Sequence, residues 1–122
     1  MQSSIVYLLI GINLIITSAG QILQKIGVSK IGVLDLTSIK DIFKFLFNPY
    51  IFSGLFLYGI GAIIWISILS RANLSFAYPM ISLSYILIIL LSKFIFNEPV
   101  TAYKWAGIIL ITLGASLIGL KT

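Results

Sequence analysis

The sequence predicts an all-α integral membrane protein with four transmembrane helices and a short amphipathic surface helix between the first two spans. Hydrophobic residues make up 60% of the 122 residues, charged residues make up 9%, and the mean hydropathy is +1.16. This composition is typical of membrane proteins. A helix needs roughly 20 residues to cross a hydrocarbon core of about 30 Å, and the chain divides into four such runs with short connections. We therefore expect a single transmembrane domain over residues 1–122.

The N-terminal part of the chain is predicted as one span, a loop and a surface helix. The span covers Ser4–Ile26 and lacks a small-residue cleavage site, so we expect a retained helix rather than a signal peptide. Residues 27–37 are predicted as a loop, and residues 38–47 as a helix with Thr37 as its N-cap. The polar side of this helix carries Lys40, Asp41 and Lys44, and its apolar side carries Ile39, Ile42, Phe43 and Leu46. Such a helix is expected to lie on the membrane surface.

Strong helix-start signals precede the second span, and a proline lies inside the third. Asn48 is a favourable N-cap and Pro49 a favourable first residue for a second span that continues to Ser70. The third span is predicted over Ser75–Phe96. Pro79 removes a backbone donor near its start, and we favour a kink there over the alternative that Pro79 marks the first turn.

The fourth span and the second both carry small residues. The fourth is predicted over Thr101–Leu120, after a break at Asn97-Glu98-Pro99. Its small residues include Gly107, Gly114, Ala115, Ser116 and Gly119. The spacing of Ala115 and Gly119 permits close helix approach, within the chain or in a dimer. The second span carries Gly54, Gly61 and Ala62 around Tyr58 and Trp65. We interpret these as packing residues, with an aromatic wall against an isoprenoid tail as the alternative.

The basic residues are distributed unevenly between the two predicted sides of the membrane. Six of the eight lie at span ends that face the first and third loops: Lys25, Lys30, Lys40, Lys44, Lys93 and Lys104. Arg71 and Lys121 lie on the other side, so the positive-inside rule places both termini outward. The net charge of +5 is expected to meet lipid headgroups rather than nucleic acid. Lys25 and Lys93 could hold a phosphate at headgroup depth. The alternative, which explains their positions near the span ends equally well, is that their side chains snorkel to the membrane surface.

A stripe of polar residues follows one face of the first span. Asn13, Thr17, Gln21 and the pair Gln24 and Lys25 recur every three to four residues in an apolar run. An amide without a partner costs several kcal/mol in hydrocarbon. The stripe is therefore expected to face other helices, a partner chain or a polar ligand.

The third span carries a second polar seam on one predicted face. Its members are Ser75, Tyr78, Ser82, Tyr85 and Ser92. Together the two faces suggest a shared groove, whose hydroxyls and amides suit a sugar or a phosphate ester better than a bare ion. The alternative is that these side chains only hydrogen-bond the helices to one another.

Several kinds of chemistry are excluded by residues that the sequence lacks. It has no His and no Cys, which removes the commonest metal ligands, acid–base groups and thiols. Its three acids, Asp35, Asp41 and Glu98, lie outside the predicted membrane core. No carboxylate is therefore placed to bind a cationic drug or to carry a coupling proton. We expect no enzymatic activity, no metal and no cofactor.

Three short motifs resemble a known group of transporters. They are Ser18-Ala19-Gly20-Gln21 with Gln24-Lys25, Ala77-Tyr78-Pro79-Met80 with Ser82-Leu83, and Glu98-Pro99-Val100. The chain resembles the four-span branch of the drug/metabolite transporter superfamily, which includes EamA-like and small multidrug resistance-like proteins. Within it, the chain is most similar to the aminoarabinose-phosphoundecaprenol flippase subunits of Gram-negative bacteria. The resemblance covers nearly the whole chain and is weakest over residues 27–50.

The resemblance implies movement of a lipid-linked sugar, such as aminoarabinose on undecaprenyl phosphate, across the bacterial inner membrane. It also implies a dimer, formed with a second copy or with a similar four-span subunit. The substrate-binding residues would be Asn13, Thr17, Gln21, Gln24, Lys25, Tyr78, Ser82 and Tyr85. Small multidrug exporters use a glutamate in the first span, where this chain has Thr17, which argues against proton-coupled drug export. Such an exporter, and a non-transporting membrane subunit of a larger complex, stay as alternatives.

Overall fold

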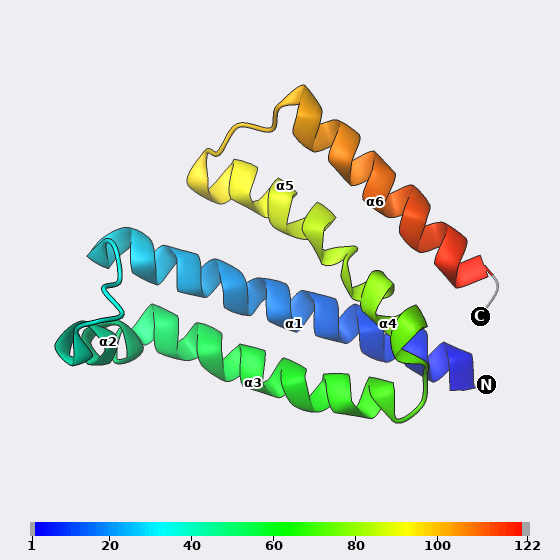
Figure 1. The fold of residues 1–122 in the computed structure, drawn as a ribbon, viewed down its shortest axis with the longest axis horizontal. Coiled ribbons are helices and arrows are strands. Elements are labelled where there is room, and N and C mark those ends of the chain that lie inside the picture. The colour runs from blue at the N-terminus through cyan, green and yellow to red at the C-terminus, as the bar shows by residue number, and fades with distance from the viewer. Residues whose placement is uncertain (1, 121–122) are drawn as a thin grey trace.

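The computed structural model describes residues 2–120, which form helices and connecting loops without a strand in that range (Figure 1). The helices are α1 (Gln2–Ile31), α2 (Ile39–Leu46), α3 (Pro49–Leu69), α4 (Leu74–Ile81), α5 (Ser84–Phe96) and α6 (Ala102–Leu120). Four stretches are long and apolar enough to cross a membrane, namely α1, α3, α4 with α5, and α6. The predicted all-α architecture of four spans and one short helix is confirmed.

Helices α1 and α3 lie side by side and antiparallel along most of their length (Figure 1). Glycines bring their backbones into contact. A Cβ atom placed on Gly20 would stand 2.7 Å from the carbonyl oxygen of Gly54, and one placed on Gly54 would overlap the carbonyl oxygen of Gly20. Further along α3, a Cβ atom on Gly61 would overlap the side chain of Thr17. The interpretation of Gly54 and Gly61 as packing residues is confirmed.

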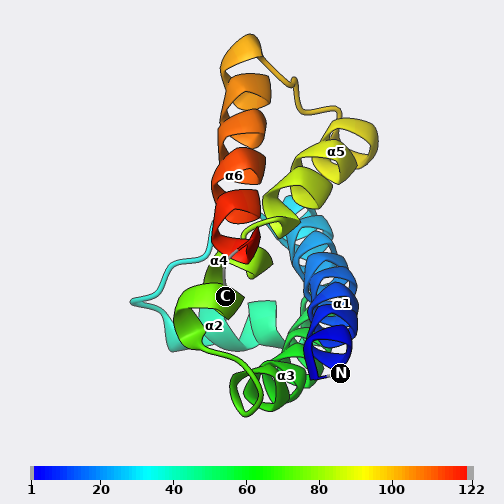
Figure 2. The ribbon, with the colours of Figure 1, turned by 90° about the vertical axis from the view of Figure 1, so that its right-hand side faces the viewer.

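The other spans join this pair mainly at one end of the molecule. Buried side chains from all four spans form one apolar core there: Val6, Ile10, Ile68, Phe76, Ala77, Met80 and Ala115. A Cβ atom on Gly119 would lie 3.4 Å from Cε of Met80. The Ala115 and Gly119 pair therefore packs within the chain, against α4. Figure 2 shows α6 standing apart from α1 and α3, so most of its surface is left for lipid or another chain.

Helix α1 is longer than predicted, and the expected end at Ile26 is wrong. The helix continues to Ile31, and the loop begins at Gly32 with a φ of +120°, which L residues rarely adopt. Gly27, predicted as the first loop residue, is a packing position instead. A Cβ atom on it would lie 2.9 Å from Oδ1 of Asn48. This glycine resembles a helix stop in the sequence, but its role is contact with the start of α3.

Asp35 organises the loop before α2. Its carboxylate accepts hydrogen bonds from the hydroxyl group of Thr37 at 2.6 Å and from the Thr37 backbone N–H at 3.0 Å. These bonds lower the pKa of Asp35. Thr37 is therefore not the N-cap of α2, and that prediction is wrong by one residue. The N-cap is Ser38, whose hydroxyl oxygen accepts from the N–H of Asp41 at 3.2 Å.

The start of α3 follows the prediction. Oδ1 of Asn48 accepts hydrogen bonds from the N–H groups of Tyr50 (3.0 Å) and Ile51 (3.2 Å), and Pro49 is the first helical residue. We expect Asn48→Ala to lower the free energy of unfolding by about 1 kcal/mol, the usual cost of a lost cap. Thermal unfolding in detergent micelles measures this loss. The control is Asn73→Ala, because the Asn73 side chain makes no cap hydrogen bond to α4. Equal losses in both variants would contradict the assignment.

The third span is broken, as the position of Pro79 predicts. The break falls one turn after the proline, at Ser82 and Leu83, between α4 and α5. There the N–H of Leu83 bonds to the carbonyl oxygen of Met80 at 3.1 Å, which is the tighter spacing of a 3₁₀ turn. The hydroxyl group of Ser82 donates to the carbonyl oxygen of Pro79. The kink therefore sets α5 at a different angle from α4 (Figure 1).

Candidate functional site

A cavity of about 460 Å³ lies between α1, α3, α4 and α5, beside the break in the third span. Its lining residues are Asn13, Thr17, Gln21, Tyr58, Ala62, Trp65, Tyr78, Ile81, Ser82, Ser84, Tyr85 and Ile88. Six of the eight residues predicted to bind substrate are among them. The two polar faces that the sequence places on separate spans therefore meet at one cavity. Ser75 and Ser92, the outer members of the predicted seam, are not part of its lining.

Helix α1 contributes the amide and hydroxyl groups of the cavity. Asn13, Thr17 and Gln21 are four residues apart, which places them on one helix face. Asn13 is 3% exposed, and its Oδ1 has no hydrogen-bond partner among the described residues. That oxygen stands 3.0 Å from the position of a Cβ atom on Gly61, so the glycine leaves room for the amide. An unpaired buried acceptor is costly, which makes Asn13 a candidate ligand contact.

Gln24 and Lys25 do not line the cavity. Gln24 packs against α3 instead, where its Cγ lies 2.8 Å from the position of a Cβ atom on Gly54. Lys25 is exposed, about one helical turn beyond Gln21 toward the C-terminal end of α1. The polar stripe of the sequence thus divides into a cavity part and a part that faces the helix pair or the membrane surface.

Two hydroxyl groups of the cavity, those of Thr17 and Ser82, have their protons engaged and are left to accept hydrogen bonds. The Thr17 hydroxyl donates its proton to the carbonyl oxygen of Asn13 at 2.7 Å, one turn earlier in α1. The Ser82 hydroxyl donates its proton to the carbonyl oxygen of Pro79. A hydroxyl group has one proton, so Thr17 and Ser82 can offer only oxygen lone pairs to a ligand. They are therefore complementary to a group that brings its own N–H or O–H donors.

Four aromatic side chains complete the lining. They are Tyr58 and Trp65 of α3, Tyr78 of α4 and Tyr85 of α5. The rings of Trp65 and Tyr78 meet edge to face, with centroids 6.0 Å apart and an angle of 76° between their planes. The faces of such rings attract cations and also stack against sugar rings.

The sequence favours packing over ligand contact for Tyr58 and Trp65, and Trp65 does pack against the apolar core and against Tyr78. Both rings also line the cavity, a position that the packing interpretation does not include. Gly54, Tyr58, Gly61 and Trp65 follow one another at spacings of four, three and four. This pattern gives one helix face on which glycines touch α1 and the aromatic rings stand beside that contact. The alternation of small and aromatic residues is the signal that could have placed both rings in the site.

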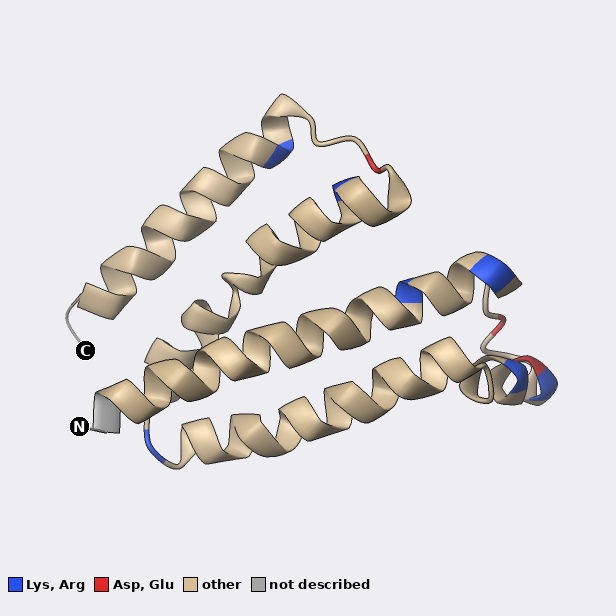
Figure 3. Cartoon of the chain, turned by 180° about the vertical axis from the view of Figure 1, so that it is seen from behind, with Lys and Arg blue, Asp and Glu red and all other residues tan. Residues whose placement is uncertain are grey.

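Among the residues that the structure describes, no charged side chain lines the cavity, and charge is separated from it along the molecule. Figure 3 shows that the Lys and acidic residues of the described chain lie toward one end, which we call the lysine end. It comprises the C-terminal end of α1, α2, the start of α3 and the loop between α5 and α6. Lys30 lies there over the ring of Tyr50, with Nζ 4.3 Å from the centroid. Arg71 lies at the opposite end, in the turn between α3 and α4.

Comparison with known proteins identifies the kind of transporter. The EamA-like transporter family matches residues 44–120. A protein of Pseudomonas fluorescens, named a probable 4-amino-4-deoxy-L-arabinose-phosphoundecaprenol flippase subunit ArnE, is 34% identical over 105 residues, which cover 86% of this chain and 89% of that protein. Proteins of the same name are 32% identical in Serratia proteamaculans, over 94% of this chain and 96% of the relative, and 32% identical in Aeromonas salmonicida, over 92% and 95%. No solved structure matches the chain. The chain is therefore a multi-pass membrane protein that belongs to the EamA-like transporter family.

Proposed function

We propose that this chain moves a polyprenyl-phosphate-linked sugar, such as aminoarabinose on undecaprenyl phosphate, across the bacterial inner membrane. The observation that carries the proposal is the neutral polar cavity at the centre of the spans, which gathers Asn13, Thr17, Gln21, Tyr78, Ser82 and Tyr85. A sugar carries many hydrogen-bonding groups and cannot cross hydrocarbon unless they are satisfied. The names of the relatives support the same class of substrate.

The chemistry of the lining favours a sugar with an amino group. Thr17 and Ser82 offer lone pairs only, Oδ1 of Asn13 lacks a partner, and four aromatic rings surround the space. A protonated amine brings three donors and a positive charge, which match these acceptors and ring faces. With no carboxylate in the lining, the charge balance must come from the phosphate of the same lipid. The site therefore suits a zwitterionic lipid-linked amino sugar better than a free cation.

The rest of the lipid would lie outside this cavity. Lys25 and the other lysines of the lysine end are placed to meet the phosphate at headgroup depth. The isoprenoid tail would stay in the bilayer against α3 and the broken third span. A second, apolar cavity of about 420 Å³ lies between α2 and α3 and is lined by Phe43, Leu46, Phe47, Phe52, Leu55 and Phe56. It offers the first part of the tail a place next to the lysines.

The translocating unit would contain a second four-span chain. The matching relatives are named as subunits. In this chain the face of α6 turned away from α4 exposes large apolar residues, including Ile109, Leu110, Leu113 and Leu117. Four helices alone enclose little volume, so a second copy or a similar subunit would close the path.

Transport in liposomes tests the proposal. We expect the purified chain, alone or with a similar four-span subunit, to move labelled undecaprenyl-phosphate aminoarabinose between leaflets. Gln21→Leu removes a polar group of the cavity and should lower the rate about fivefold to tenfold, the effect of losing one hydrogen bond of roughly 1 kcal/mol.

The control for this experiment is Thr112→Val in α6. The Thr112 hydroxyl is bonded to the carbonyl oxygen of Ile108 at 2.8 Å, and this residue is outside the cavity. Its loss should leave the rate unchanged. Wild-type transport in the Gln21→Leu variant would show that the cavity is not the path.

A further inference from the structure

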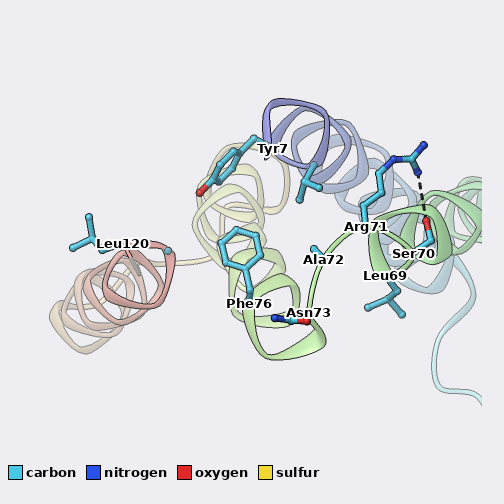
Figure 4. Close-up of a pocket in the computed structure, with 10 residues that line it drawn as sticks. Tyr7, Leu69, Ser70, Arg71, Ala72, Asn73, Phe76 and Leu120 are labelled. Carbon is cyan, nitrogen blue, oxygen red and sulfur yellow. Dashed lines mark hydrogen bonds between the residues drawn. The ribbon is translucent and has the colours of Figure 1, made fainter. Parts of the chain in front are cut away.

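A third cavity lies at the end opposite the lysines. It has a volume of about 520 Å³ and is formed where the start of α1, the turn between α3 and α4, helix α4 and the end of α6 converge. Figure 4 shows Arg71 at one rim with its guanidinium group over Ser70, and Tyr7, Phe76 and Leu120 on the other side. From the sequence, Arg71 is expected only as a charge on the outward side. In the structure Arg71 lines this cavity, so its charge can act on a group bound there.

The guanidinium group of Arg71 is held in place and has donors to spare. Its Nη1 donates to the hydroxyl oxygen of Ser67 at 2.6 Å and to the carbonyl oxygen of Ser67 at 3.2 Å, with a longer contact of 3.5 Å to Ser70. Its hydrogen bonds within the described residues all come from Nη1. An arginine has five N–H donors in a planar fork. The donors on Nε and Nη2 are therefore available for an oxyanion.

The positive charge of Arg71 has no acidic side chain near it. The sequence contains three acids, Asp35, Asp41 and Glu98, and all three belong to the lysine end. Arg71 is the only cationic side chain among the described residues at its own end (Figure 3). A charge at headgroup depth without a protein counter-ion attracts an anion from the membrane or the solvent.

The neighbours of Arg71 suit an anion that is attached to an apolar chain. The rings of Tyr7 and Phe76 meet edge to face with centroids 5.8 Å apart, and Leu120 of α6 also lines the cavity (Figure 4). Ser70 adds a neutral polar group beside Arg71, and Asn73 adds another next to Phe76 (Figure 4). The lining thus combines a positive group and neutral polar groups with apolar side chains, which matches a phosphate ester of a lipid.

We propose that this cavity is a second phosphate-ester site, in which Arg71 binds the lipid phosphate at the leaflet opposite the lysine end. The proposal rests on the proposed function, because a lipid that changes leaflet must present its phosphate to both ends of the protein in turn. The bound group is a phosphate ester, and its source is either the transported lipid or an ordinary anionic phospholipid.

Thiol protection in the full-length chain tests this site directly, because the natural sequence has no Cys. Asn73→Cys places a single thiol in the cavity, and the Asn73 side chain makes no cap hydrogen bond that the substitution would break. The protein is held in phosphatidylcholine nanodiscs and modified with a membrane-impermeant thiol reagent. A ten-carbon polyprenyl phosphate should slow modification at least fivefold. Adding Arg71→Gln should abolish this protection, and Arg71→Lys should retain part of it.

The control is Lys104→Gln, which removes a cation at the lysine end and should leave protection of the thiol at position 73 intact. Two further probes identify the source of the phosphate. Protection by phosphatidylglycerol at the same mole fraction would assign the site to anionic headgroups in general, and protection by inorganic phosphate would assign it to the phosphate group alone. Absence of protection by all three probes, or protection that survives Arg71→Gln, would overturn the proposal. The assay needs no transport, so failure of translocation in liposomes would remove the proposed function and leave this site standing.

Discussion

Gly54→Ala is expected to lower the free energy of unfolding by about 1–3 kcal/mol, the usual cost of adding a methyl group to a closely packed contact. The added Cβ atom would overlap the carbonyl oxygen of Gly20 and would stand 3.0 Å from the backbone nitrogen of Gln24. Backbone atoms of a neighbouring helix cannot rotate out of the way, so α1 and α3 must separate. Since the cavity uses side chains of both helices, its geometry would change as well.

The matched control is Gly59→Ala in the same helix. A Cβ atom on Gly59 would meet no atom within 4 Å, so the substitution adds no contact between helices. Alanine is the better helix former by roughly 1 kcal/mol, and we expect this variant to be as stable as the wild type or slightly more stable. Unfolding in mixed micelles, followed by circular dichroism, compares the two. Equal stability of both variants would mean that α1 and α3 do not approach as closely as described.

The positions of the spans could be predicted from the sequence because apolar length and helix breakers act locally. Asn48 with Pro49 and the kink after Pro79 were found in this way, since a cap or a missing backbone donor affects only the adjacent turn. The end of α1 could not be found by the same reasoning. Gly27 resembles a helix stop, and only its contact with Asn48 and Ile51, more than 20 residues later in the chain, shows why a glycine is needed there.

The site was predicted in part for a similar reason. Polar residues on apolar helices are conspicuous, so Asn13, Thr17 and Gln21 could be assigned to one functional face from one helix alone. Aromatic residues are common in membrane helices, so the sequence alone does not mark Tyr58 and Trp65 as site residues. They can be recognised as cavity residues only when α1, α4 and α5 are placed beside α3. The commitment of the Thr17 and Ser82 protons to backbone carbonyls is a matter of local geometry that no sequence pattern contains.

Tyr78→Leu is expected to lower transport of the amino-sugar lipid about tenfold to thirtyfold. Tyr78 lines the cavity and contacts Trp65, so its loss removes one ring face and unpacks a second. A cation–π contact away from water contributes about 2 kcal/mol, and each 1.4 kcal/mol changes a binding constant about tenfold. Initial rates in liposomes with the labelled amino-sugar lipid measure the effect.

Two comparisons separate recognition of the amine from a general effect on the cavity. Tyr78→Phe keeps the ring and loses the hydroxyl group, so it should retain most of the transport rate. A substrate whose amine has been acylated carries no positive charge, so the wild type should transport it more slowly than the free amine. Tyr78→Leu should lower the transport rate of this acylated lipid much less than that of the free amine. Tyr103→Leu alters a tyrosine that is 90% exposed and remote from the cavity lining, and should have no effect.

Each outcome assigns a different role to Tyr78. A loss in Tyr78→Phe as large as in Tyr78→Leu would mean that the phenol hydroxyl, rather than the ring face, contacts the substrate. Equal losses for the amine and the acylated lipid would mean that Tyr78 shapes the cavity without reading charge. Selective loss for the amine would show how a site without a carboxylate distinguishes an amino sugar from a neutral one. The ring faces would attract the charge of the amine, and the lone pairs of Thr17 and Ser82 would accept its N–H donors.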